Sequence, residues 1–229
     1  MSRFAGWIKK LEWAVHDAIG ADISTPRARR RSRWHYLWVD HGLLRIWWTN
    51  FDRVADGVYR SNQPDPKRLA GYRDRGIRSI LNLRGRSRYS FHLFEAEACR
   101  DLGLELSDIH LSATELPSLK TLQKLEQHFR SLPRPFLMHC KSGADRAGFA
   151  AALYLMLIEG VPVEQACRQL SLRYLHIRAS RKGILDFCLE TYRKTNEASP
   201  IPFRDWMETM YDPEAITAAF NAGRSGAGR

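Results

Sequence analysis

The sequence has 229 residues, a formal net charge of +11 and 44% hydrophobic residues. The hydrophobic content is typical of a soluble globular protein. No uninterrupted apolar run reaches the length of a membrane-spanning helix, and the N-terminus lacks the apolar core of a signal peptide. The four cysteines are widely and irregularly spaced, which predicts neither a zinc site nor a disulfide framework. We therefore expect one globular domain with extensions.

The first predicted element lies in residues 1–50, which we expect to form a helical, basic and aromatic extension. Apolar residues recur at helical spacing over Phe4–Ile19. They predict an amphipathic helix that either docks on the domain or lies on a membrane surface. A basic linker, Pro26–Arg33, follows; it either steers the protein to an anionic partner or is a solvated connector. No nucleic-acid reader module is recognisable, so we favour a phosphate-rich substrate or membrane surface over nucleic acid.

The next segment, residues 34–48, is dense in aromatic side chains. Its spacing predicts one or two helices packed on the main domain. These aromatic rings either form a stacking platform for a ligand or fill the core. We favour core filling, because aromatic side chains bury large areas.

Residues 51–195 alternate between short apolar runs and helical patterns. The expected strands are Val58–Arg60, Arg78–Leu83, Leu104–Leu111 and Phe136–Met138. The expected helices are Pro66–Arg75, Ser90–Leu102, a helix after Ser118, Phe149–Ile158, Val163–Arg173 and Lys182–Arg193. The alternation predicts an α/β domain with a parallel-rich central sheet flanked by helices. Residues 196–229 follow as a C-terminal extension, with a flexible tail expected from Gly223.

One loop of this domain carries the predicted chemistry. The strand Phe136–Met138 leads to Cys140, and Arg146 follows five residues after that cysteine. Gly143 lets the backbone turn its N–H groups inward, and such a nest at a helix N-terminus binds phosphate oxygens. The planar guanidinium of Arg146 can hold two more oxygens. Because the same positive field favours the thiolate of Cys140, the loop places a nucleophile beneath a bound phosphate.

These residues carry a family resemblance. His139, Cys140 and Arg146 resemble the His-Cys-x5-Arg signature of cysteine-dependent phosphatases, the tyrosine and dual-specificity group. Two upstream segments, Val58–Pro64 and Gly76–Gly85, are similar to strand-and-turn segments of bacterial and fungal-type atypical dual-specificity phosphatases. The resemblance covers roughly residues 51–192. It implies a dual-specificity phosphatase-like fold and phosphomonoester hydrolysis through a phosphocysteine, without a cofactor or metal. The residues that would bind the phosphate are Lys141, Ser142, Gly143, Ala144, Asp145 and Arg146.

A general acid must protonate the leaving oxygen. The Gly-x-Asp-Arg sequence that ends at Arg146 resembles myotubularins and bacterial lipid-or-tyrosine phosphatases. This resemblance implies that Asp145 supplies the proton from inside the loop. The alternatives are Asp108, within a predicted strand, and Glu115, on a loop that could swing in. In either case Asp145 would orient Arg146 or cap the helix.

The substrate is predicted from the charges around the loop. Lys141 and the neighbouring arginines indicate more than one negative charge on the substrate, and Lys after the Cys resembles phosphoinositide phosphatases. A phosphorylated protein of the phosphotyrosine type and an anionic phospholipid or inositol phosphate both stay open. Arg84 ends a predicted strand at the same sheet edge and either contacts substrate or lies on the surface. A catalytic thiol needs a reducing compartment, so we expect the cytoplasm, with peripheral contact at the inner membrane surface as an option.

One departure from the family concerns Ala147, because the family usually has Ser or Thr after the Arg. That hydroxyl assists departure of the thiolate, so we expect slow breakdown of the phosphoenzyme. Two other classes of function remain as alternatives. Ala147 favours a phosphate-binding pseudophosphatase that acts as an adaptor, and a rhodanese-like sulfurtransferase also uses a loop cysteine at a strand end.

Overall fold

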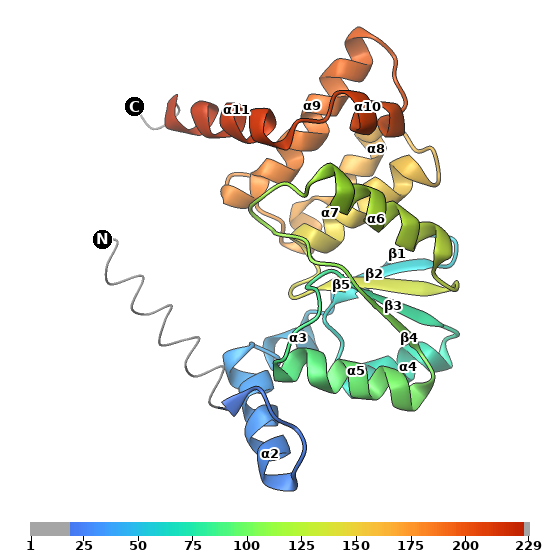
Figure 1. Cartoon of the computed structure of the whole chain (residues 1–229), viewed down its shortest axis with the longest axis vertical. Helices are drawn as coiled ribbons and strands as arrows, with labels where there is room; N and C mark the ends of the chain where they lie inside the picture. Colours follow the sequence, from blue (N-terminus) through green and yellow to red (C-terminus); the bar gives the residue numbers. More distant parts are fainter. Residues whose placement is uncertain (1–18, 227–229) are drawn as a thin grey trace.

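The computed structural model of the chain describes residues 19–226. The amphipathic helix expected over Phe4–Ile19 therefore lies, apart from its last residue, outside the described residues. The described part is centred on one five-stranded sheet with strand order β1-β2-β5-β3-β4 (Figure 1). The strands are β1 (Asp52–Ala55), β2 (Val58–Asn62), β3 (Ser79–Asn82), β4 (Glu105–Asp108) and β5 (Phe136–Cys140). Only β1 is antiparallel to its neighbour, which confirms the parallel-rich α/β sheet.

Helices cover both faces of the sheet (Figure 1). On one face α4 (Pro66–Asp74) and α5 (Ser90–Leu102) enclose a small core, and on the other α6 (Leu119–Ser131) and α7 (Asp145–Leu157) enclose a larger one. Leu137 belongs to the small core and Met138 to the large one. This alternation follows from the two-residue period of a strand, and it makes β5 a central strand buried on both faces.

Several helix boundaries follow directly from the local sequence. The side chain of Asp65 accepts a 2.8 Å hydrogen bond from Arg68 N at the start of α4, and Ser118 caps α6 in the same way. Gly103, with φ +67°, ends α5 in the left-handed conformation that glycine adopts readily. The strand expected over Leu104–Leu111 is shorter, since β4 ends at Asp108.

The helix expected over Val163–Arg173 is broken. It consists of α8 (Val163–Ala166) and two 3-10 turns, η2 (Cys167–Gln169) and η3 (Leu172–Tyr174). The carbonyl of Gln169 accepts a 2.7 Å hydrogen bond from buried Arg60, so that group binds a side chain instead of continuing a helix. A third turn, η4 (Arg181–Gly183), precedes α9 (Ile184–Ala198), where one helix from Lys182 was expected.

The N-terminal extension differs from its sequence-based prediction in two ways. The basic segment is a helix, α2 (Pro26–Trp34), because Thr25 caps it and Pro26 occupies the first turn. A π-helix, η1 (His35–Val39), and the short α3 (Leu44–Trp47) follow. The expected core filling is wrong for most of the aromatic rings: Tyr36 is buried, whereas Trp34, Trp38, Trp47 and Trp48 are exposed.

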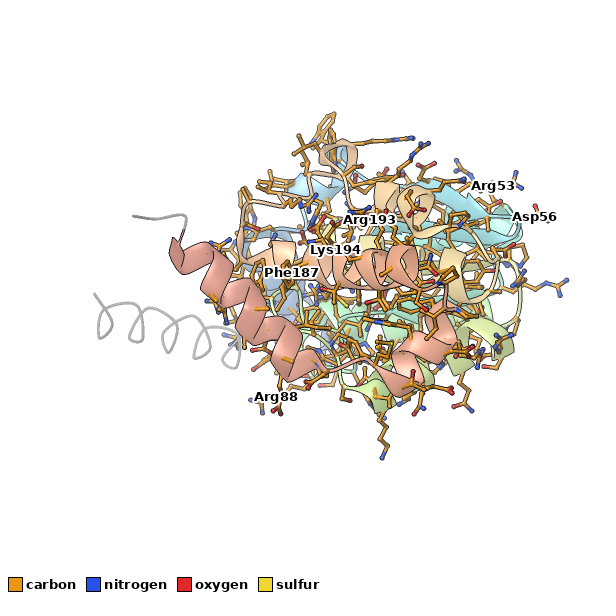
Figure 2. All side chains as sticks on the ribbon, turned by 90° about the horizontal axis from the view of Figure 1, so that it is seen from above. Arg53, Asp56, Arg88, Phe187, Arg193 and Lys194 are labelled. Atoms are coloured by element: carbon orange, nitrogen blue, oxygen red, sulfur yellow. The ribbon has the colours of Figure 1, made fainter. Side chains whose placement is uncertain are left out.

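The C-terminal helices α10 (Phe203–Thr209) and α11 (Pro213–Gly226) share the large core of the α/β domain. Phe187 of α9 packs against Phe220 of α11 with ring centroids 5.6 Å apart, and Figure 2 shows Phe187 beside α11. Helix α11 thus extends past Gly223, where a flexible tail was expected. At the far end of the same view, Arg53 and Asp56 mark the β1–β2 hairpin (Figure 2). Among residues 19–226, no helix has both the length and the apolar character needed to cross a membrane.

Candidate active site

The expected phosphate-binding loop joins the end of β5 to the start of α7. Cys140 is the last residue of β5 and is 1% exposed, and α7 begins at Asp145. Gly143 in the loop has φ +74°. A Cβ atom at this position would lie 2.6 Å from Asn62 N, so both the backbone conformation and the space require glycine.

The loop carbonyl groups are held by donors that lie outside the loop, on β2 and on the chain segments that flank it. Because these contacts fix each carbonyl, they also fix the orientation of each peptide plane. The contacts are Gln63 N to Lys141 O (3.4 Å), Asn50 Nδ2 to Ser142 O (2.8 Å), and Arg60 Nη2 to Gly143 O (2.6 Å) and Ala144 O (3.2 Å).

The opposite side of these peptide groups is available to a ligand. The N–H groups of Ser142 and Gly143 have no hydrogen-bond acceptor among the described residues. Arg146 is half-buried and has no hydrogen-bond or ion-pair partner in residues 19–224. The loop also leads into a 13-residue helix whose first turn carries partial positive charge. These groups together form an anion site next to Cys140.

Arg60 supports this loop from inside the protein. Its side chain is fully buried, and its guanidinium carbon lies 3.8 Å from the centroid of the Tyr174 ring. Nη1 donates 2.7 Å hydrogen bonds to both O and Oε1 of Gln169. Burial lowers the pKa of Arg60 to about 10, while the nearby Tyr174 and Cys140 groups oppose that shift. Arg60 is therefore protonated at neutral pH and places a buried positive charge close to Cys140.

A group of ions that we call the Asp40 cluster lies on one side of the loop. The carboxylate of Asp40 is 2.8 Å from Arg45, 2.8 Å from Arg84 and 3.3 Å from Lys141. Burial by itself would raise the pKa of Asp40, but the three cations lower it below the usual range. Arg84 also lies over the ring of Phe91, 3.6 Å from its centroid. Arg84 is thus the buried partner of Asp40, so the alternative of a surface arginine is wrong, whereas contact with a substrate stays a prediction.

Lys141 is the most exposed member of the Asp40 cluster, with 39% of its side chain accessible. Burial lowers the pKa of Lys141, and Arg84 adds to that shift while Asp40 opposes it. The cluster contains three cations and one carboxylate, so it carries excess positive charge at the edge of the loop.

A second group, the His176 cluster, lies on the other side of the loop. His176 Nδ1 is 2.9 Å from Asp145 Oδ1, and Nε2 is 2.6 Å from Asp186 Oδ2. Lys182 Nζ lies 2.9 Å from Asp145 Oδ2. Although burial opposes it, hydrogen bonding to the two carboxylates raises the pKa of His176 to about 9. The pKa of Asp145 is lowered, because His176 and Lys182 outweigh the effect of burial.

The other two candidate acids have different surroundings. Asp108 accepts a 2.7 Å hydrogen bond from Asn82 and lies 3.6 Å from His92 Nε2. Glu115 is exposed on the loop after β4. No hydrogen bond or ion pair in the described part of the chain joins either carboxyl group to the phosphate-binding loop.

His139 holds the end of β5 in the sheet. It is fully buried, and its Nε2 lies 2.7 Å from Glu95 Oε1 of α5. Glu95 Oε2 in turn accepts a 3.2 Å hydrogen bond from Gln63. These contacts connect α5 to the strand immediately before Cys140.

Sequence reasoning missed several residues that hold the loop. They are Asp40, Asn50, Arg60, Glu95 and His176. A usable signal existed for Arg60, an arginine inside a predicted strand that resembles the phosphatase segment. For the other four, the sequence pattern gives no sign that they come close to the loop.

The α/β fold and the arginine-closed cysteine loop define the general class of protein as a phosphatase of the tyrosine or dual-specificity type. The tyrosine phosphatase family model matches residues 52–225, and the chain belongs to this family. The expected resemblance is thereby confirmed.

Two solved structures resemble the chain, and its fold is similar to that of the first. The core catalytic domain of the PP-IP phosphatase SIW14 from S. cerevisiae is 21% identical, with a TM-score of 0.50 over 66% of this chain and 95% of that chain. TpbA from P. aeruginosa is 17% identical, with a TM-score of 0.48 over 75% of this chain and 90% of that chain. Among curated protein sequences, no match was found.

Proposed function

We propose that this phosphatase hydrolyses phosphate monoesters through a phosphocysteine formed at Cys140. One observation carries the proposal: the loop carbonyls are held from outside, while the N–H groups of Ser142 and Gly143 and the guanidinium of Arg146 have no partner in the described residues. Such preorganised donors stabilise the charge on a phosphoryl group during transfer. The buried charge of Arg60 adds to that field.

The reaction has two displacement steps. The Cys140 thiolate attacks phosphorus, a P–S bond forms, and the P–O bond to the leaving group breaks. The leaving oxygen takes one proton from the protein. Water then attacks phosphorus and gives one proton back to the group that protonated the leaving oxygen. The P–S bond breaks, and phosphate leaves as the thiolate is restored. Arg146 and the loop N–H groups bind the phosphoryl oxygens in both steps.

For the proton we propose the pair formed by Asp145 and His176, with Asp145 as the residue that touches the leaving oxygen. The raised pKa of His176 and the lowered pKa of Asp145 place the proton of the resting pair on His176. Two groups this close titrate as a unit, so the pair holds one exchangeable proton at neutral pH. In the first step this proton passes from His176 Nδ1 to Asp145 Oδ1 and from Asp145 to the leaving oxygen. Neither Asp108 nor Glu115 has a comparable connection to the loop.

The second step should be slow, because Ala147 offers no hydroxyl group. Its side chain is buried against the large core beside the loop. We propose that phosphoenzyme accumulates and that rapid mixing shows a burst of released alcohol followed by a slower steady rate. Release of alcohol that is linear from the first turnover would contradict this point.

The proposed substrates are a phosphotyrosine-type protein or a phosphoinositide or other phosphorylated lipid. The positive Asp40 cluster and the half-exposed Lys141 favour a substrate with more than one negative charge. We also propose that the protein contacts a membrane through the amphipathic N-terminal segment and the basic helix α2. The thiol nucleophile suits a reducing compartment such as the cytoplasm.

The central experiment measures phosphate release from p-nitrophenyl phosphate, phosphotyrosine and phosphoserine peptides, and phosphoinositide vesicles. Cys140→Ser should abolish release from every substrate, whereas Cys167→Ser, at a half-buried cysteine outside the loop, should leave it unchanged. Full activity in Cys140→Ser would refute the mechanism. Binding of phosphate by the wild-type chain without any turnover would instead indicate an adaptor.

The variant Arg60→Lys tests whether the loop depends on the donors that hold its carbonyl groups. Lysine keeps the positive charge but cannot reach two loop carbonyls and Gln169 together, since its ammonium is a single point donor. We expect kcat to fall by at least tenfold in a folded protein, with vanadate binding weakened in parallel. Unchanged vanadate affinity would show that the loop does not depend on this support.

The proton donor is tested by leaving-group dependence. Asp145→Asn should slow esters of poorly acidic alcohols by about 10²–10⁴-fold, with a much smaller effect on p-nitrophenyl phosphate, whose leaving group needs little protonation. Asp108→Asn and Glu115→Gln are the matched variants. If either of these shows the selective loss and Asp145→Asn does not, the acid has been assigned to the wrong carboxyl group.

A further inference from the structure

Exposed hydrophobic side chains are concentrated in two short segments of the chain. Eight of the eleven large hydrophobic residues that are exposed within the described part belong to them. The eight residues are Leu43, Leu44, Ile46, Trp47 and Trp48 in the first segment, and Leu172, Leu175 and Ile177 in the second. We call these two segments, residues 43–48 and 172–177, the apolar rim. A soluble protein rarely exposes so many large apolar side chains in one region unless they bind something.

Both segments of the rim are attached to the phosphate-binding loop through Asn50. Asn50 Nδ2 donates to Ser142 O at 2.8 Å and to Tyr174 O at 3.0 Å, and Asn50 Oδ1 accepts from Trp48 Nε1 at 2.8 Å. One side chain thus joins the first segment, the second segment and the loop. Both segments of the apolar rim therefore lie next to the phosphate-binding loop rather than on a remote surface.

The second segment is held in a conformation that costs free energy. Leu175 has φ +62°, in the left-handed region that residues other than glycine rarely adopt. Leu175 is 57% exposed, so the unfavourable backbone conformation does not serve to bury this residue in the core. The conformation instead presents Leu175 to the outside, which is what a binding surface requires.

Cations accompany these apolar side chains. Lys141 and Lys182 have 39% and 43% of their side chains exposed, and Arg173 is also exposed while it pairs with Asp52. Apolar and aromatic side chains interspersed with cations are the composition of surfaces that bind the headgroup region of anionic membranes. A second copy of the chain would bring an equally basic rim against this one, in a protein with a net charge of +11, so self-association is disfavoured.

We propose that the apolar rim docks the active-site entrance onto an anionic phospholipid surface, and that the substrate is a phosphorylated lipid in that surface. This rests on the proposed phosphomonoesterase function. Trp47, with 87% of its surface exposed, and Leu172, with 74%, enter the interfacial layer of the bilayer. Arg146 and the loop N–H groups then meet a phosphate that stays at the membrane surface, and no lipid has to leave the bilayer.

The test is cosedimentation of the full-length chain with phosphatidylcholine vesicles that contain about a third phosphatidylglycerol. Neither Trp47 nor Leu172 has a polar contact with the loop, and the double variant Trp47→Ser, Leu172→Ser removes both from the rim. Vesicle affinity should fall at least tenfold, because two large apolar side chains lose their burial. Met210→Ser, at an exposed hydrophobic residue outside the rim, is the control and should bind like wild type.

Measurements of phosphatase activity distinguish the docking proposal from the proposed phosphomonoesterase function on which it rests. The double variant should keep wild-type turnover of soluble p-nitrophenyl phosphate and lose at least tenfold in turnover of phosphatidylinositol phosphate presented in vesicles. If wild type and Cys140→Ser are equally inactive on the soluble ester while vesicle binding depends on the rim, the proposed function fails and the docking surface stands.

Three other results would overturn the docking proposal. Wild type and double variant could bind vesicles equally, in which case a variant with Trp7→Ser and Leu11→Ser would show whether the N-terminal segment carries the affinity. Light scattering could show a dimer that the double variant loses, which would make the rim a contact between copies. Selective loss of phosphotyrosine-peptide turnover would show that the rim holds a peptide.

Discussion

The two ionic clusters on either side of the phosphate-binding loop have opposite designs. In the Asp40 cluster one buried carboxylate gathers three cations, Arg45, Arg84 and Lys141. In the His176 cluster one buried imidazole lies between two carboxylates, Asp145 and Asp186. The first centre is a permanent anion, whereas the second titrates.

In the proposed mechanism, this difference allows one loop to be both rigid and able to exchange a proton. Arginine stays charged throughout the physiological range, so the Asp40 cluster keeps one charge state and positions Lys141. Histidine changes its charge in response to its partners, and the pKa of His176 is raised to about 9 by hydrogen bonds to two carboxylates that overcome its burial. In the proposed mechanism, structural support and proton exchange therefore belong to different sides of the same loop.

The largest effect is expected from Asp40→Asn, which breaks the Asp40 cluster at its centre. Arg45 and Arg84 would then be buried without a countercharge, and removing one partner of a buried ion pair typically costs about 3–5 kcal/mol. The free energy of unfolding, measured by urea denaturation, should fall by this order, and the loop should lose phosphate affinity.

Asp56→Asn is the matched control for this variant. Asp56 also forms an ion pair with an arginine, Arg53, but at a fully exposed turn (Figure 2). Such pairs contribute little, so the unfolding free energy should stay within about 1 kcal/mol of wild type. Equal losses in the two variants would mean that the Asp40 cluster has no special role.

The next effect concerns the pH dependence of stability through His176. Its folded-state pKa is about 9 and its ordinary value is 6.5, so its stabilising contribution is complete below about pH 6.5 and is lost as the pH rises through about 9. A raised pKa of this size corresponds to roughly 3 kcal/mol. Urea unfolding between pH 6 and 10 should show this loss in wild type, and His176→Gln should flatten that part of the curve.

The exposed His41 provides a control for the histidine substitution. His41 has φ +59°, a conformation that asparagine also adopts, so His41→Asn should fold normally and keep the wild-type pH dependence. An unchanged alkaline loss of stability in His176→Gln would show that another group is responsible.

The smallest effects are expected at the two half-exposed lysines, one in each cluster. Lys182→Gln and Lys141→Gln should each change the unfolding free energy by less than about 1 kcal/mol, because exposed ion pairs are weak. Their kinetic effects should differ: Lys141→Gln should raise KM for substrates with several negative charges, and Lys182→Gln should change the pH profile of kcat. Identical kinetic profiles would remove the functional distinction between the clusters.

Much of the fold could be predicted because local signals agree with it. The buried runs at β3 and β5, the caps Asp65 and Ser118, and Gly103 act within a few residues of the elements they define. The failures arise where a distant group decides the outcome. Buried Arg60 binds the carbonyl of Gln169, where the sequence predicted a continuous helix. The tryptophans of residues 34–48 were expected in the core because they are hydrophobic, but they are exposed.

In the candidate site, too, residues set by local sequence could be predicted, whereas residues set by distant contacts could not. The positions of Cys140, Gly143 and Arg146 follow from one short loop, so their spacing was sufficient. The partners of that loop come from residues far along the chain, such as Asp40 and His176, and no local pattern records those contacts. The surroundings of Asp145, and hence its protonation, could be determined only from three-dimensional contacts.

The long-range contacts of Asn50 affect when the active site can form during synthesis of the chain. Its amide binds Ser142 and Tyr174, which are separated from it by 92 and 124 positions. Contacts between such distant positions require large loops to close and tend to form late in folding. A nascent chain that has emerged only as far as α7 would contain the cysteine and the arginine but not the second anchor of Asn50. Competence for turnover should therefore appear only after the segment around Tyr174 has left the ribosome.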